Sequence, residues 1–151
     1  MELKNLLSDL GFEFPEATTP GGNYMSVNVR GKTAFVAIQF PIRNDEFRYQ
    51  GTLGEDLTKE EGRAAMELCA LNVLAQIEAK VGMEHVLGLN HIEAVYRAAP
   101  SWDEAPKVVD AASDLFVQVL GEKGRHSRSI FGVADLPRGF CVGLTCSFTL
   151  I

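Results

Sequence analysis

The sequence has few cysteines, no excess of basic residues and no long apolar run. Its three cysteines are Cys69, Cys141 and Cys146. A low, odd number without a secretory leader is typical of buried, reduced thiols rather than of a disulfide framework. The net charge of −6 has the wrong sign for a protein that neutralises phosphates with a basic face. We therefore expect no nucleic-acid partner.

A membrane span and a signal peptide are also missing from the pattern. A spanning helix needs about 20 mostly apolar residues in a row, and no stretch comes near this. Residues 1–11 alternate apolar with polar side chains and so lack the apolar core of a leader. We expect residues 1–151 to form one domain of a cytoplasmic protein that has no membrane partner.

Motifs for metal binding, phosphate binding and covalent catalysis are missing or incomplete. His85, His91 and His126 do not have the spacing of metal ligands, so we expect no metal site. Gly31-Lys32-Thr33 has Ser26 where a phosphate-binding loop needs its first glycine, and a strand follows it instead of a helix. A hairpin turn explains these three residues better. No nucleophile elbow and no Cys–His arrangement supports covalent catalysis.

Helix and strand patterns alternate regularly along the chain. We expect a helix over 2–10, strands over 24–29 and 33–40, a helix from Thr58 to Gly82, a strand over 86–98, a helix from Pro106 to Gly121, and strands over 129–133 and 141–150. Residues 43–57 are expected to form a loop with room for one short strand. This order predicts an α+β fold in which two helices cover one face of a mixed sheet, after a short N-terminal helix.

Two helices can cover only one face of such a sheet. The second of them is expected to turn Val109, Ala112, Ser113, Phe116, Val117 and Leu120 inward. Phe35, Val36, Ile38 and Phe131 are then apolar strand residues that need another cover. An exposed patch of this kind normally marks an interface, so the pattern favours an oligomer.

One stretch, residues 121–129, points to a ligand. It combines two glycines with Lys123, Arg125, His126 and Arg128 and leads directly into an apolar strand. An arginine at the mouth of a strand suits two-pronged capture of a carboxylate, because its planar guanidinium matches that anion. An ordinary solvated basic loop explains the same residues, and the residues by themselves leave both interpretations open.

Short matches that run in order over residues 20–150 make the sequence similar to a known family. They are Gly22-Asn23-Tyr24, Gln39-Phe40-Pro41, Gly51 to Gly54, Ala70-Leu71-Asn72-Val73-Leu74, Pro106-Lys107-Val108-Val109, Ala112-Ser113-Asp114-Leu115, Gly124-Arg125-His126-Ser127-Arg128-Ser129, Gly132-Val133 and Leu136-Pro137. Together they resemble the YjgF/Rid family, which often carries an endoribonuclease label. The longer helix-to-strand loop resembles the subgroup with chains of about the present length, 151 residues.

The resemblance implies a chorismate-mutase-like fold, a homotrimer and three clefts between neighbouring subunits. Deaminase members of the family hydrolyse 2-imino acids to 2-oxo acids and ammonia without a cofactor, so no cofactor is expected. Arg128 matches the arginine that grips the substrate carboxylate, Tyr24 matches the tyrosine of the cleft, and Ile130 occupies a position that lines the pocket. The implied partners are a small carboxylate metabolite and further copies of the chain.

The sequence departs from the family's pattern at three positions of the cleft. Where the family has Ser-Gly-Gln, this chain keeps Gln39 but carries Ile38 in place of the glycine. The asparagine of the deaminases falls near Asp110 or Ala111. The glutamate that holds the attacking water falls on Gly143, so no residue is assigned a catalytic role.

Two functions of different classes therefore remain open. Ile38 and Gly143 favour a non-catalytic trimer that binds a small carboxylate. The alternative is an imine or enamine deaminase, which would have to use a water held by backbone carbonyls. A ribonuclease is disfavoured, because the chain is acidic and lacks a His–Glu acid–base pair beside a phosphate cradle.

Overall fold

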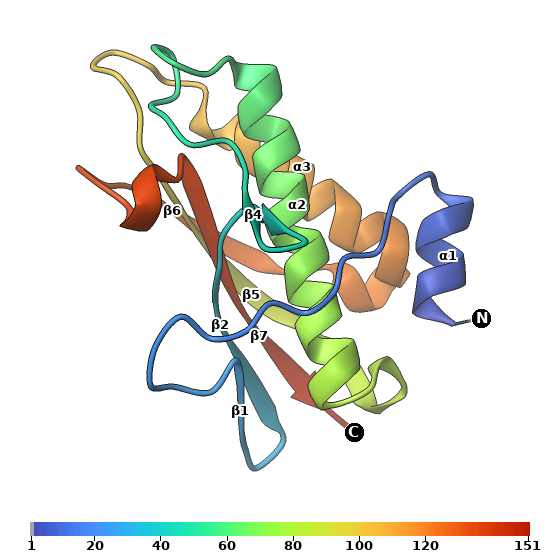
Figure 1. Cartoon of the computed structure of the whole chain (residues 1–151). Coiled ribbons are helices and arrows are strands. Elements are labelled where there is room, and N and C mark those ends of the chain that lie inside the picture. Colours follow the sequence, from blue (N-terminus) through green and yellow to red (C-terminus); the bar gives the residue numbers. More distant parts are fainter. Residues whose placement is uncertain (1) are drawn as a thin grey trace.

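The computed structural model describes residues 2–151 and shows two layers, a sheet and the helices that pack on one of its faces (Figure 1). The helices are α1 (Leu3–Asp9), α2 (Lys59–Lys80) and α3 (Ala105–Leu120). The strands are β1 (Val27–Arg30), β2 (Thr33–Gln39), β3 (Ile42–Arg43), β4 (Glu46–Phe47), β5 (Val86–Tyr96), β6 (Ser127–Gly132) and β7 (Val142–Leu150). The predicted order of elements is confirmed, and the β3–β4 hairpin is added to it.

Local sequence signals explain where the main elements begin. Thr58 and Glu61 exchange side-chain and backbone hydrogen bonds at the start of α2, which is the arrangement of a capping box. Pro106 lies in the first turn of α3, where its missing N–H has no helical partner to lose. Gly31 has φ +58° in the two-residue turn between β1 and β2, so the Gly31-Lys32-Thr33 stretch is the predicted hairpin turn.

The five main strands form one mixed sheet in the order β1-β2-β7-β5-β6. β5 and β6 run parallel, and the other neighbouring pairs are antiparallel. This confirms the predicted α+β architecture with a mixed sheet. Because β2 and β6 are separated by β7 and β5, side chains on these two strands lie about 14 Å apart at the usual strand spacing.

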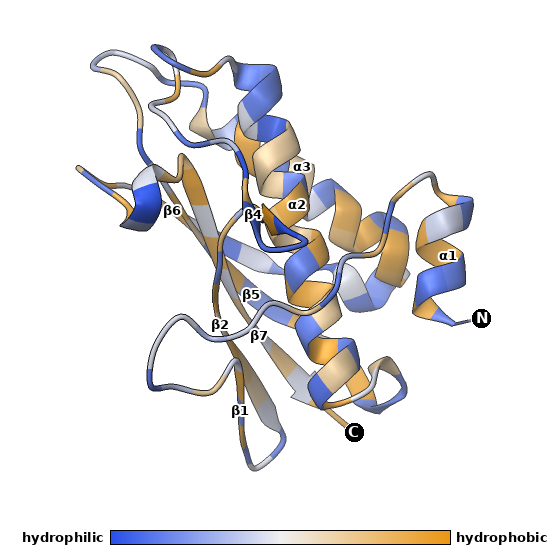
Figure 2. Ribbon diagram, viewed as in Figure 1, coloured by the Kyte–Doolittle hydropathy of each residue, from blue (hydrophilic) through white to orange (hydrophobic). Residues whose placement is uncertain are grey.

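The helices α2 and α3 bury one face of the sheet and leave the other open. In Figure 2 apolar residues recur along both helices and along the strands beside them. Phe35 and Phe131 are 51% and 53% exposed on the open face, as the prediction requires. Val36 is only 1% exposed and faces the helices, so its predicted place on the uncovered face is wrong. Val117 was also wrongly expected to point inward, since α3 leaves it 40% exposed.

A β-bulge in β2 explains why neighbouring residues differ from simple alternation. Val36 is opposite Cys146 and Gln39 is opposite Leu144, so β2 has one more residue than β7 between these pairs. An extra residue of this kind changes which side chains point to which face. The bulge turns Gln39 toward α2 and leaves Ile38 on the open face of the sheet.

The part of the chain that the structure describes contains no helix with the length and apolar character needed to cross a membrane.

Candidate functional site

The residues singled out in the sequence form two clusters, one near the β1–β2 edge of the sheet and one at β6, the strand of the opposite edge. Tyr24, Ile38, Gln39 and Gly143 lie around the end of β2. Arg128 lies on β6 together with Ile130, the other predicted lining residue, which packs against the hydrophobic core. A single chain therefore does not bring Arg128 next to Tyr24.

Ile38 packs directly on Gly143 in the first cluster. A Cβ atom added at Gly143 would lie 2.8 Å from Ile38 Cδ1 and 2.9 Å from Phe40 Cε1. Carbon atoms in favourable contact are about 3.5–4.0 Å apart, so one of these side chains would have to move. Gly143 is thus explained by packing, because the missing side chain makes room for two bulky ones.

The Gln39 side chain points toward α2, away from the face that carries Ile38, and joins a buried polar network. Its Oε1 accepts hydrogen bonds from Thr18 Oγ1 at 3.1 Å and from Gln76 Nε2 at 3.4 Å. Its Nε2 donates one hydrogen bond, to Ala37 O at 2.9 Å. An amide nitrogen has two hydrogens, so one N–H of Gln39 has no partner among residues 2–151.

Asn72, one turn before Gln76 on α2, holds the chain where it leaves β2. Its Nδ2 donates to the carbonyl oxygens of Phe40 and Ile42, both at 2.9 Å. Asn72 is fully buried, and its own Oδ1 has no hydrogen-bond partner among the described residues. The buried Asn72 side chain therefore fixes the backbone at Phe40, whose ring lies next to Gly143.

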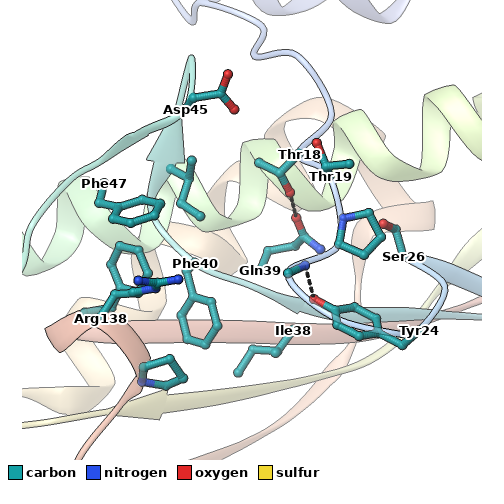
Figure 3. A pocket seen from close by; sticks show the side chains of 15 residues that line it. Thr18, Thr19, Tyr24, Ser26, Ile38, Gln39, Phe40, Asp45, Phe47 and Arg138 are labelled. Carbon is teal, nitrogen blue, oxygen red and sulfur yellow. Dashed lines mark hydrogen bonds between the residues drawn. The ribbon is translucent and has the colours of Figure 1, made fainter.

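A cavity of about 460 Å³ opens beside this cluster (Figure 3). Its lining comes from the loop 18–26, from the end of β2 with the β3–β4 hairpin, and from the turn 137–140. Tyr24, Ile38 and Gln39 all line it. The Tyr24 ring is half exposed, and its hydroxyl accepts a hydrogen bond from the Gly21 N–H at 3.1 Å.

Two further residues of this cavity, Phe47 and Arg138, were missed in the sequence. The guanidinium of Arg138 lies over the Phe47 ring, 5.6 Å from its centroid. One sequence signal could have found this part of the site. Asn44 and Asp45, with φ 52° and 62°, form a two-residue hairpin turn of the kind that these residue types favour.

Arg128 in the second cluster is already engaged. Its Nη1 donates to Asp110 Oδ1 at 2.8 Å and to Ser113 Oγ at 3.1 Å, and its Nη2 donates to Pro106 O at 3.4 Å. A guanidinium has five N–H donors, so Nε–H and one Nη2–H remain without a partner among residues 2–151. Asp110, near which the family's asparagine falls, thus neutralises part of the charge that a ligand would meet.

The cysteines are poorly suited to nucleophilic chemistry. Burial raises the pKa of the Cys141 thiol to about 12, and it raises the pKa values of Cys69 and Cys146 as well. A thiol of this kind carries almost no thiolate at neutral pH. Over residues 2–151 we also find no group of three His, Cys, Asp or Glu side chains placed to hold a metal ion.

A family model described as "YjgF/chorismate_mutase-like, putative endoribonuclease" matches residues 4–147. The chain belongs to this family. As a YjgF-family protein it is 38% identical over 138 residues to Protein TCP17 of Trypanosoma cruzi, which covers 90% of this chain and 86% of the relative.

Solved structures support the same assignment. A crystal structure described as a putative endoribonuclease from Shewanella oneidensis is 33% identical, with a TM-score of 0.95 over 99% of this chain and 100% of that one. TdcF from E. coli, solved with bound serine, is 16% identical, with a TM-score of 0.62 over 89% and 91% of the two chains. The second likeness is one of fold alone. The predicted family and chorismate-mutase-like fold are thereby confirmed for this YjgF-family protein.

Proposed function

We propose that this protein is a homotrimer that binds a small carboxylate metabolite, a 2-oxo or 2-imino acid, in clefts between subunits and has no strong deaminase activity. The packing of Ile38 on Gly143 carries this proposal. The family resemblance puts the water-holding glutamate of the deaminases at Gly143. Here the position has no side chain, and Ile38 and Phe40 fill the space that one would need.

The separation of the two clusters supports a site shared between chains. Arg128 and Tyr24 lie near opposite edges of one sheet. They can meet only if the Arg128 edge of one copy adjoins the Tyr24 edge of the next. Such a head-to-tail contact closes a ring of three when each copy is rotated by a third of a turn from the last, the symmetry that the family resemblance implies. The exposed Phe35 and Phe131 rings give the open sheet face apolar area that an assembly would bury.

The remaining donors of Arg128 support binding of a carboxylate. Its Nε–H and one Nη2–H are unused within residues 2–151, and Asp110 with Ser113 holds the guanidinium in a fixed orientation. Two parallel N–H groups are what a carboxylate accepts in a two-pronged pair. The serine bound to TdcF, a relative in fold, is itself a small carboxylate.

The proposal is tested by measuring mass and activity on the same preparation. Light scattering at micromolar concentration is expected to give three times the chain mass. Release of 2-oxo acid from enzymatically generated 2-aminoacrylate is expected to stay close to the spontaneous rate. A monomer would overturn the shared site, and a rate equal to that of an active family deaminase would favour the enzyme instead.

Mixing two defective variants tests whether neighbouring chains share the site. Arg128→Ala and Tyr24→Ala are each expected to weaken binding of pyruvate. If the two chains are unfolded and refolded together, about a quarter of the clefts in a random cyclic assembly combine an intact Arg128 with an intact Tyr24. Calorimetry should then recover that fraction of wild-type sites. No recovery in trimers of proven mixed composition would show that neighbouring chains do not share the site.

A further inference from the structure

Three phenylalanine rings form an apolar wall in the cavity beside the β3–β4 hairpin. The Phe40 and Phe140 rings are stacked, with centroids 5.0 Å apart and planes 11° apart. The Phe47 ring meets Phe140 edge-on at 5.4 Å. Ile38 continues the wall. Aromatic walls of this kind favour a flat apolar group that adds its own ring to the cluster.

Arg138 adds a cation to this wall. Its guanidinium lies over Phe47, and no carboxylate oxygen of residues 2–151 comes within 4.0 Å of it. Figure 3 shows the guanidinium pointing toward the phenylalanine rings. The backbone of Arg138 is held in a left-handed conformation, φ 57°, and Gln50 Nε2 donates to its carbonyl oxygen at 2.6 Å. Non-glycine residues held in this way are costly and are common in ligand clamps.

The charge and size of the cavity limit what it can hold. Its lining contains one cation, Arg138, and one acid, Asp45. No ion pair within 4.0 Å joins Asp45 to Arg138, so the guanidinium keeps the one positive charge that a single carboxylate can pair with. A polyanion such as a nucleotide would carry further charge that nothing balances. The volume of about 460 Å³ lies within the usual range of small-molecule sites, roughly 300–1,000 Å³.

From these observations we propose that the cavity binds a small monocarboxylic acid that carries an aromatic ring. Arg138 pairs with the carboxylate, and the ring lies against Phe40 and Phe47, which Phe140 supports from behind. Arg138 and the three phenylalanines lie in one chain, and Arg128 takes no part in these contacts. This site goes beyond the proposed function, although Tyr24, Ile38 and Gln39 border both sites.

Calorimetry with phenylpyruvate and pyruvate tests the proposal, because the two acids differ only in the ring. Wild-type protein is expected to bind phenylpyruvate at least about tenfold more tightly, since an aromatic ring leaves water. Arg138→Gln should weaken phenylpyruvate binding by about tenfold or more, because a charge-assisted pair is lost. Phe47→Ala should remove most of the preference for phenylpyruvate over pyruvate. Both side chains are exposed, so both variants are expected to fold.

Two arginine variants separate this site from the proposed cleft. Arg48→Gln removes an exposed guanidinium next to Phe47 that pairs with Glu46 and does not line the cavity, so it should leave phenylpyruvate binding unchanged. Arg128→Gln removes the carboxylate anchor of the proposed cleft and should leave one phenylpyruvate per chain bound at Arg138, whereas Arg138→Gln should lose that site. Loss of phenylpyruvate binding in Arg128→Gln but not in Arg138→Gln would overturn the inference and support the proposed function. Equal affinity of the wild type for both acids would overturn the inference as well.

Discussion

Arg128 and Arg138 belong to different clusters and differ in what surrounds them. Arg128 donates to Asp110 and Ser113, so its orientation is fixed and part of its charge is neutralised. Arg138 lies over Phe47, and no carboxylate oxygen of residues 2–151 comes within 4.0 Å of its guanidinium, so its orientation is held more weakly. A sequence motif identifies an arginine, but only its neighbours decide how much of its charge a ligand meets.

The largest effect is expected from changing both residues of the Ile38–Gly143 contact. Ile38→Gly with Gly143→Glu should raise 2-aminoacrylate hydrolysis by about 10²- to 10⁴-fold, because a positioned general acid–base contributes that much. Gly143→Glu alone should gain less, since its Cβ meets Ile38, and the two changes should be non-additive. The measurement is release of 2-oxo acid above the spontaneous rate.

The matched control for this design is Ile38→Gly with Gly143→Gln. Glutamine has nearly the same shape as glutamate but cannot take a proton as a carboxylate does. If the glutamine variant were as fast as the glutamate variant, the gain would come from the opened space and not from acid–base catalysis.

Removing Arg128 should have the next largest effect. Arg128→Ala is expected to weaken pyruvate binding by roughly 10- to 150-fold, the range of a charge-assisted hydrogen bond. Arg128→Lys should not restore it fully, because an ammonium cannot bind in two prongs. Arg125→Ala is the control, since Arg125 is exposed and pairs with Glu122. Unchanged affinity in Arg128→Ala would reduce the role of Arg128 to its ion pair with Asp110.

The free energy of unfolding should depend on buried Asn72 much more than on an exposed residue of α3. Asn72→Ala leaves the carbonyl oxygens of Phe40 and Ile42 without their donor, and we expect a loss of about 1–3 kcal/mol in the free energy of unfolding. Urea unfolding measures it. Gln118→Ala, on the exposed face of α3, should change stability little. Equal stability of the two variants would show that the hydrogen bonds from Asn72 do not stabilise the backbone at Phe40 and Ile42.

The smallest effect is expected at the partner of Arg128. Asp110→Asn should strengthen pyruvate binding by roughly two- to fivefold, because a partly exposed ion pair is worth little and its loss frees Arg128. Asp114→Asn removes an exposed acid on the same helix and is the matched control. Weaker binding in Asp110→Asn would mean that Asp110 is needed chiefly to orient Arg128.

Much of the fold could be predicted because its signals are local. The capping box of Thr58 and Glu61, the turn at Gly31 and the periodicity of the two long helices depend only on residues close in sequence. These are features that short segments determine by themselves.

The errors have long-range causes. Simple alternation puts Val36 and Ile38 on one face, but the bulge after Val36 puts them on different faces, and this bulge is defined by pairing with β7, more than a hundred residues away. Arg138 was missed because Phe47, which it covers, is distant in sequence. The ion pair of Arg128 with Asp110 joins a strand to a helix, and spacing alone could not predict it.

The central position of β7 has a consequence for biosynthesis. β7 follows the other four strands of this sheet in the chain, yet it joins β2 to β5 in the middle of the sheet. Until then the β1–β2 hairpin and the β5–β6 pair have no common neighbour, and bare strand edges of this kind pair readily with other chains. Such distant pairing is also slow. We therefore expect this sheet to be completed only after translation has passed β7.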